Sequence, residues 1–159
     1  MPRKKPFRIG RSRTGLGLFA TASIEKRTVI VEYKGRKLAN DEADKLEARG
    51  NRYLYEVNSR WTIDGSSRRN IGRYANHSCR PNAESHYLNG KIILRAIKII
   101  RPGDEITYDY GTDYYRNVIT PRGCKCVKCR QKRRDARRAQ RAAKARRLAR
   151  LRARSCKSG

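Results

Sequence analysis

Apolar residues are concentrated before about residue 120, and this uneven distribution constrains the fold more than any other feature of the chain. A length of 159 residues suffices for one domain of modest core and a short appendage. From Arg130 to Gly159, 14 residues are Lys or Arg and one, Asp135, is acidic. The core must therefore form from the first 120 residues, and we expect a folded body followed by a basic tail.

The body has the pattern of short strands separated by tight turns. Asn89-Gly90 is the strongest turn signal, because both residues readily adopt the positive φ that a two-residue hairpin needs. β-branched and aromatic residues predict strands at 28–33, 53–57, 60–64, 87–100 and 105–110. This pattern indicates a compact, mainly β fold.

Two segments favour helix instead. Residues 40–49 form the one short helix candidate of the body, with Asn40 as its N-cap and Gly50 at its end. Residues 130–154 contain mostly Arg, Ala, Leu and Gln and no Gly or Pro, which favours one long helix. Because Arg repels Arg at i,i+4, we expect this helix to fray when free and to form fully beside an anion.

Three motifs occur in a specific order: GLG at 15–17, RYANHSCRPNA at 73–83 and GDEITYDYG at 103–111. Together they resemble the SET-domain family of protein lysine methyltransferases, over roughly residues 8–130. The resemblance implies a β-clip fold of small sheets around a pseudoknot, in which 105–110 threads the 76–82 segment. We expect a basic leader, a SET domain, a post-SET-like zinc segment and a basic helical tail, at residues 1–8, 9–112, 113–130 and 131–159.

The implied activity is S-adenosylmethionine-dependent protein-lysine N-methylation. Methyl transfer to an amine needs in-line placement and exclusion of water rather than a nucleophilic side chain. By resemblance Tyr110 is the active-site tyrosine and Tyr53 lines the lysine channel, although Tyr55 competes for that role. Tyr108 occupies the family's Phe/Tyr switch position, and its extra hydroxyl predicts monomethyl-lysine as the main product. Without the resemblance, each of these tyrosines would be interpreted as a residue that packs in the core.

The resemblance also assigns cofactor contacts. Glycines permit the backbone to approach a cofactor closely. Taken alone, however, a GLG sequence indicates only a turn, and a single histidine is more often a core residue. The residues expected to contact S-adenosylmethionine are Gly15, Leu16, Gly17, Leu18, Arg73, Asn76, His77 and Tyr110.

Cys124-x-Cys126-x-x-Cys129 supplies three closely spaced thiols, one short of a tetrahedral metal site. The family's post-SET segment implies Cys79 as the fourth ligand of a structural Zn²⁺. The spacing CxCxxC is shorter than the family's CxCxxxxC, which affects the expected geometry but not the number of ligands. Four reduced thiols are the alternative, and Cys156 is expected to be a free thiol.

The net charge of +27 predicts polyanion partners or basic substrates. We expect a protein substrate with a target lysine, such as a histone or histone-like protein, and nucleic-acid binding through the tail. A solvated extension, a nuclear-targeting signal and methylation of Lys144 or Lys157 are alternative roles for the tail.

No 18-residue apolar run occurs, so no membrane span is expected. We expect an intracellular monomer, located in the cytoplasm or nucleoid of a bacterium, or in a nucleus, including that of a host. The competing function is a non-catalytic, nucleic-acid- or chromatin-associated protein that retains a SET scaffold.

Overall fold

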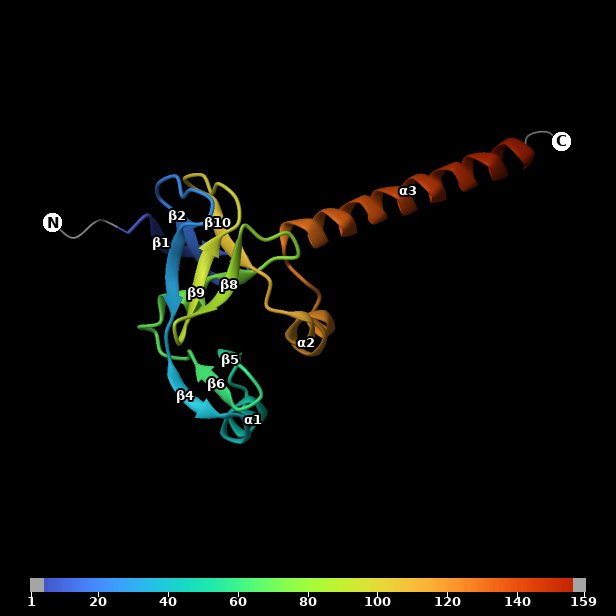
Figure 1. Cartoon of the computed structure of the whole chain (residues 1–159). Helices are drawn as coiled ribbons and strands as arrows, with labels where there is room; N and C mark the ends of the chain where they lie inside the picture. The colour runs from blue at the N-terminus through green and yellow to red at the C-terminus, as the bar shows by residue number, and fades with distance from the viewer. Residues whose placement is uncertain (1–4, 156–159) are drawn as a thin grey trace.

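The computed structural model describes residues 5–155 and shows a body of small sheets from which one long helix projects (Figure 1). Three sheets make up the body, with strand orders β1-β2-β10-β7, β3-β9-β8 and β4-β6-β5. The strands are β1 (Phe7–Ser12), β2 (Gly15–Ala20), β3 (Val29–Tyr33), β4 (Arg36–Ala39), β5 (Leu54–Glu56), β6 (Trp61–Asp64), β7 (Asn76–His77), β8 (Ala83–Leu88), β9 (Lys91–Ala96) and β10 (Glu105–Tyr108).

The helical elements are shorter, apart from the last. They are α1 (Asn40–Ala48), η1 (Ile71–Tyr74), α2 (Thr112–Tyr114), the π-helical turn η2 (Tyr115–Ile119), η3 (Thr120–Arg122) and α3 (Val127–Ser155). The mainly β fold with a C-terminal helix is thus confirmed. Within the described residues, none of the helices combines the length and apolar character that a membrane span requires.

The strand β10 lies between two segments that are distant in sequence. It pairs antiparallel with β2, where Ile106 faces Leu18, and parallel with β7, where Tyr108 faces His77. The Asn82 side chain adds two bonds to β10: it accepts from the Thr107 N–H at 2.8 Å and donates to the Glu105 carbonyl at 2.8 Å. Residues 76–82 therefore hold β10 from one side, as the predicted pseudoknot requires.

Both predicted hairpins are confirmed. β8 and β9 pair antiparallel across Asn89-Gly90, whose φ values of 48° and 78° are those that a two-residue turn of this kind demands. β5 and β6 also pair antiparallel. The core beneath the sheets contains wholly buried aliphatic side chains, among them Leu18, Leu94 and Ile106.

Several sequence boundaries were wrong. The strand β1 starts at Phe7, which pairs with Ala20, so the predicted leader of residues 1–8 extends too far. Residues 97–100 form no strand: the Ile97 N–H bonds to the Asn82 carbonyl, and Ile100 makes only an isolated bridge to Ile24. Similarly, β10 ends at Tyr108 rather than at Tyr110.

Asn40 does not cap helix α1. Ala39 occupies the N-cap position without a side-chain hydrogen bond. The Asn40 amide instead donates to the Asn58 carbonyl at 3.0 Å and accepts from the Thr62 hydroxyl at 2.8 Å. Asn40 therefore ties the helix to the neighbouring β5–β6 hairpin.

Candidate active site and metal centre

One cavity of about 1200 Å³ collects most of the predicted site residues. Its walls come from the start of β2, helix α1, strand β5, η1, β7, the end of β10 and the 112–126 segment. The predicted site residues that line it are Gly15, Leu16, Tyr53, Arg73, Asn76, His77, Tyr108, Tyr110, Cys124 and Cys126. The fold thus brings the GLG, NHSC and YDY motifs to one place.

Two predicted cofactor contacts lie elsewhere. Leu18 is wholly buried in the core, because it lies where β2 pairs with β10, so its side chain does not reach the cavity. Gly17 does not line the cavity either. A Cβ atom at Gly17 would lie 2.5 Å from the Glu105 carboxylate and 3.2 Å from the Asn76 amide nitrogen. Gly17 therefore makes room for the contact between these two side chains.

The Asn76 side chain is held by two acceptors. Its amide nitrogen donates to the Leu16 carbonyl at 3.0 Å and to the Glu105 carboxylate at 2.7 Å. Both amide hydrogens are thereby used, and the amide oxygen has no partner among the described residues. This oxygen can accept a hydrogen bond from a ligand in the cavity. The role of Glu105 was missed, although the GDEITYDYG motif contains it.

Tyr108 and Tyr110 pack together, with their ring centroids 4.8 Å apart. The Tyr110 hydroxyl donates to the Ala75 carbonyl at 2.8 Å, whereas the Tyr108 hydroxyl has no partner among the described residues. Burial raises the pKa of both hydroxyls well above the usual range, so both stay protonated at neutral pH. Tyr108 can therefore donate a hydrogen bond inside the cavity.

The structure separates Tyr53 from its competitor Tyr55. The Tyr55 hydroxyl bonds to the Ser85 hydroxyl at 2.7 Å, whereas no described residue bonds to the Tyr53 hydroxyl. Arg73 places its guanidinium 3.8 Å from the centre of the Tyr53 ring, in a cation–π contact that fixes the ring. Tyr53 is thus the better candidate for the channel wall. Arg73 also donates to the Ser66 carbonyl, while its buried Nε has no partner among the described residues.

Three further tyrosines, Tyr33, Tyr74 and Tyr114, line the cavity but were not among the residues predicted for the site. Tyr33 lines it and donates to the Tyr53 carbonyl at 2.8 Å. Tyr114, from α2, packs edge-on against Tyr110 with the ring centroids 5.2 Å apart. Nothing in the local sequence distinguished Tyr114, because its role depends on the path of the chain after β10.

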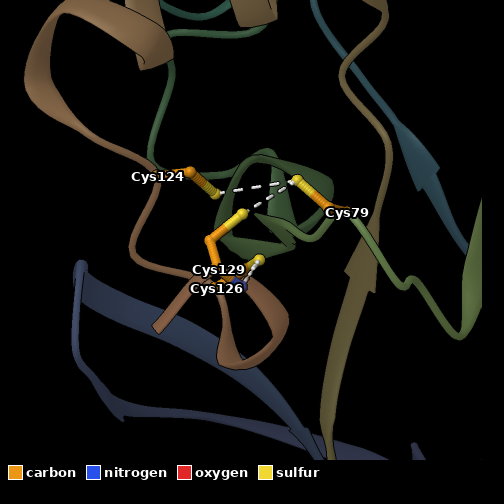
Figure 2. A group of neighbouring side chains, drawn as sticks. All are labelled: Cys79, Cys124, Cys126 and Cys129. Carbon is orange, nitrogen blue, oxygen red and sulfur yellow. Dashed lines mark hydrogen bonds between the residues drawn. The ribbon is translucent and has the colours of Figure 1, made fainter. Parts of the chain in front are cut away.

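Four cysteines from two parts of the chain converge beside this cavity (Figure 2). The sulfur atoms of Cys79, Cys124, Cys126 and Cys129 all lie within 4.8 Å of one another. Cys79 Sγ is 3.9 Å from Cys124 Sγ and 3.6 Å from Cys129 Sγ. Four thiolates at roughly 2.3 Å from a tetrahedral Zn²⁺ would be about 3.8 Å apart, so these residues fit zinc.

The short CxCxxC spacing works because Cys129 lies in the first turn of α3. Its N–H points at Cys126 Sγ, at 3.5 Å. Burial disfavours the Cys126 thiolate, but hydrogen bonds from Cys129 and Cys79 outweigh it and lower the Cys126 pKa to about 7. The Cys126 thiolate, the form that binds metals, is thus accessible near neutral pH, whereas burial raises the pKa of Cys79 to about 11 and that of Cys124 to about 12. Cys156 lies outside the described residues.

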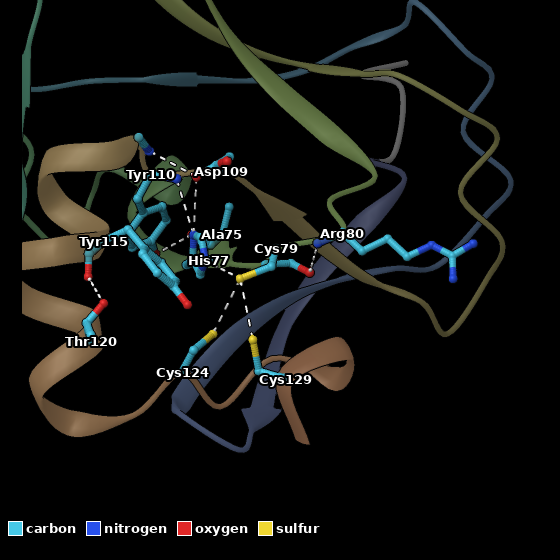
Figure 3. A network of polar contacts seen from close by, with 12 residues as sticks. Ala75, His77, Cys79, Arg80, Asp109, Tyr110, Tyr115, Thr120, Cys124 and Cys129 are labelled. Atoms are coloured by element: carbon cyan, nitrogen blue, oxygen red, sulfur yellow. Dashed lines mark hydrogen bonds and ion pairs between the residues drawn. The ribbon is translucent and has the colours of Figure 1, made fainter. Parts of the chain in front are cut away.

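His77 lies between the tyrosine-lined cavity and the cysteine cluster (Figure 3). Its Nε2 is 3.3 Å from Cys79 Sγ, and its Nδ1 accepts a hydrogen bond from the Tyr110 N–H at 3.3 Å. Burial lowers the His77 pKa, against the opposing effect of the Asp109 carboxylate at 3.6 Å. The ring is therefore neutral at neutral pH, and it packs within the site rather than beside solvent.

Small sheets around a threaded strand, a tyrosine-lined cavity and an adjoining four-cysteine cluster together define a SET-type domain. The model of the family described as SET domain matches residues 15–111, which is more than half of the chain, and the chain belongs to this family.

Curated relatives support this membership. Histone-lysine N-methyltransferase set-2 of Caenorhabditis elegans is 40% identical over 119 residues, which cover 68% of this chain and 8% of the relative. Histone-lysine N-methyltransferase 2D of Homo sapiens is 36% identical over 116 residues, covering 67% of this chain and 2% of the relative. The chain thus spans less than a tenth of the length of these two proteins.

Solved structures share the fold. A structure described as ctPRC2 in an autoinhibited conformation bound to S-adenosylmethionine has a TM-score of 0.61 and 30% identity, over 67% of this chain and 15% of that one. The Chaetomium thermophilum polycomb repressive complex 2 has a TM-score of 0.62 and 30% identity, over 69% of this chain and 16% of that one. Membership of the SET family therefore rests on sequence and structure together.

Proposed function

We propose that this chain is an S-adenosylmethionine-dependent protein-lysine N-methyltransferase. The observation that carries the proposal is the meeting of Tyr108, Tyr110, Asn76 and His77 in one cavity of a SET domain. The relatives named as histone-lysine N-methyltransferases and the structure described as bound to S-adenosylmethionine support it. By the same comparison, the proposed substrate is a lysine of a histone or histone-like protein.

The cofactor end of the cavity combines backbone and side-chain groups. Gly15 and Leu16 border it at the start of β2, and Asn76 and His77 border it from β7. Asn76 presents the unpaired oxygen of its amide, because Leu16 and Glu105 hold the nitrogen. When bound there, S-adenosylmethionine supplies an electrophilic methyl group. Arg73 lines the same cavity and holds the Tyr53 ring by a cation–π contact.

The tyrosines would orient the lysine and keep water away. Tyr110 holds its hydroxyl on the Ala75 carbonyl, which fixes the ring against Tyr108 and Tyr114. The neutral phenols and their burial disfavour the charged ammonium form of an entering lysine, leaving the nucleophilic amine. Placement and water exclusion then account for catalysis without a general base.

We infer that monomethyl-lysine is the main product. The Tyr108 hydroxyl has no protein partner among the described residues, so it can bond to the substrate amine or to a water beside it. Such a bond occupies the space that an already methylated nitrogen would need. Tyr108 is 7% exposed, and its buried ring leaves the hydroxyl little freedom to move away.

We also propose that the four cysteines hold a structural Zn²⁺, with no open position for catalysis. The metal would join Cys79, which follows β7, to the 124–129 segment, which follows the cavity-lining residues 112–122. Residues 113–130 would thus act as the post-SET-like segment that closes the lysine channel. Removal of the metal should release this wall of the cavity.

Helix α3 is the proposed nucleic-acid contact. Residues 131–153 are exposed along their whole length, and the helix projects from the body (Figure 1). It contains 14 Lys or Arg and one acidic residue, Asp135. Phosphates would neutralise this charge without base-specific contacts, so binding should be independent of sequence. We propose that the protein acts inside the cell, on chromatin or a nucleoid, and as a monomer.

A comparison of methyl transfer with nucleic-acid binding distinguishes the enzymatic function from the non-catalytic one. Wild type is incubated with isotope-labelled S-adenosylmethionine and mixtures of histones or ribosomal proteins, and nucleic-acid binding is measured in parallel. An enzyme labels a protein in the mixture, and cofactor binding is detectable. Nucleic-acid binding with neither cofactor binding nor labelling would instead identify a non-catalytic protein that retains the scaffold.

A further inference from the structure

The His77 ring is held rigidly between two tyrosines. Its centroid lies 5.5 Å from that of Tyr110 and 5.3 Å from that of Tyr115, and its side chain is only 6% exposed. The ring therefore has little freedom to rotate. Its position along the chain, two residues before Cys79, places it at the border between the cavity and the cysteine cluster.

The two ring nitrogens have different partners, which fixes the tautomer. Nδ1 accepts the Tyr110 backbone N–H, so Nδ1 carries no hydrogen. In a neutral ring the hydrogen then lies on Nε2, and Nε2 donates to Cys79 Sγ at 3.3 Å. Figure 3 shows the resulting series of hydrogen bonds, which runs from the cysteine cluster through His77 to the Tyr110 backbone.

We propose that His77 is a positioning residue that couples the four-cysteine cluster to Tyr110. Tyr110 is fixed at two points, its hydroxyl by Ala75 and its backbone amide by His77. A metal-bound thiolate accepts hydrogen bonds, and bonds of this kind orient the groups around a metal site. Order in the cluster thus fixes His77, and His77 fixes the Tyr110 backbone. The effect on methyl transfer rests on the proposed function, whereas the two hydrogen bonds do not.

Three substitutions separate the two hydrogen bonds. His77→Asn keeps an acceptor near the Nδ1 position and loses the donor to Cys79. His77→Gln keeps a donor near the Nε2 position and loses the acceptor for the Tyr110 N–H. His77→Phe keeps a ring between Tyr110 and Tyr115 and loses both bonds. His86→Asn is the control, because His86 is the second of the chain's two histidines and contacts Glu84 and Arg95 on the β8–β9 sheet.

The measurements use the full chain loaded with Zn²⁺, or with Co²⁺ as a spectroscopic probe, and do not require activity. We expect His77→Gln to raise the exchange rate of the Tyr110 amide hydrogen roughly tenfold, as the loss of one hydrogen bond implies. We expect His77→Asn to shift the thiolate-to-Co²⁺ charge-transfer band and to accelerate metal release to a chelator. His77→Phe should show both effects, and His86→Asn neither.

Chelation provides the direct test of coupling. In wild type, metal removal should accelerate Tyr110 amide exchange, and in His77→Phe it should add little to exchange that is already fast. The coupling is refuted if His77→Phe retains wild-type Tyr110 protection with metal bound, or if chelation accelerates exchange equally in both proteins. Circular dichroism confirms that each variant is folded.

The activity readout distinguishes this inference from the proposed function. If wild type transfers methyl groups, His77→Gln should lower kcat more than it raises the KM for the protein substrate. If wild type transfers none, the proposed function fails, while the exchange and Co²⁺ measurements still decide whether His77 couples the cluster to Tyr110.

Discussion

Individual hydrogen bonds divide the tyrosines of the cavity by role. The hydroxyls of Tyr33, Tyr55, Tyr110 and Tyr114 are each bound to a protein group, whereas those of Tyr53, Tyr74 and Tyr108 have no partner among the described residues. A bound hydroxyl fixes its ring and forms a rigid wall. An unpaired hydroxyl is available to substrate, and Tyr53 and Tyr108 combine this property with the channel and switch positions that the family resemblance implies.

Tyr108→Phe should raise the methylation state of the product. The substitution removes only the hydroxyl, and the ring still packs on Tyr110 at the same place. Mass spectrometry of the product peptide should change from mainly monomethyl to di- and trimethyl forms, with Tyr55→Phe as the matched control. Dominant trimethylation by wild type would contradict the assignment of Tyr108.

Glu105→Ala should weaken cofactor binding through Asn76. The carboxylate accepts from the Asn76 amide at 2.7 Å, so its removal frees the amide to rotate. Loss of one such bond predicts an increase of about 5-fold to 10-fold in the Kd for S-adenosylmethionine. Titration calorimetry measures this value, and Glu84→Ala on the β8–β9 sheet is the control. An unchanged Kd would show that the Asn76 orientation does not matter.

At the scale of elements, local sequence patterns were sufficient to predict the hairpins but not the structure of the segment after β10. Asn89-Gly90 specifies its turn by its own backbone preferences, so sequence alone predicted β8 and β9. Residues 112–122 form only short helical turns, which were not predicted. They pass beside the cavity because the chain must lead from β10 to the cysteines.

The same reasoning explains why Leu18 does not line the cavity. Leu16 and Leu18 belong to one motif, but the pairing of β2 with β10 covers Leu18 and leaves Leu16 beside the cavity, 51% exposed. Strand pairing between distant segments is not visible in local sequence. The motif therefore predicts that this part of the chain lies at the cavity, but not which of its residues line it.

Metal removal should loosen the 112–126 segment before it unfolds the body. This segment contains no residue of the main core cluster, and it is held to the body by the ring contacts of Tyr114 and Tyr115 and by the approach of Cys124 and Cys126 to Cys79. Hydrogen exchange in the presence of a chelator should increase in residues 112–130, while β8 and β9 stay protected. Methyl transfer should be lost in parallel. Full activity of a metal-free protein would contradict a structural zinc.

At the scale of the whole molecule, the body and helix α3 have different requirements. The body owes its fold to a buried core, whereas α3 is exposed over residues 131–153 and gains little from tertiary packing. The long helix was predicted from composition, and α3 begins three residues earlier because Cys129 joins it to the cluster. Fraying of the free helix stays a prediction, which circular dichroism with and without nucleic acid would test.

Charge on α3 should make nucleic-acid binding strongly dependent on salt. Arg134, Arg137 and Arg141 are spaced to share one face of the helix. Replacing all three by Gln should reduce the slope of log K against log salt by roughly 2 to 3, if each contacts one phosphate. Gln140→Ala is the control. A slope that is unchanged in the triple variant would place the contact elsewhere.

The most direct test of the central claim is methyl transfer by wild type and Tyr110→Phe, measured with isotope-labelled S-adenosylmethionine and site mapping by mass spectrometry. The substitution removes the hydroxyl that holds the ring on Ala75 and leaves α3 unchanged. We predict labelled lysine in a basic protein with wild type, and loss of transfer with intact nucleic-acid binding in the variant. Equal labelling by both proteins, or labelling of no lysine by wild type, would contradict a methyltransferase built around Tyr110.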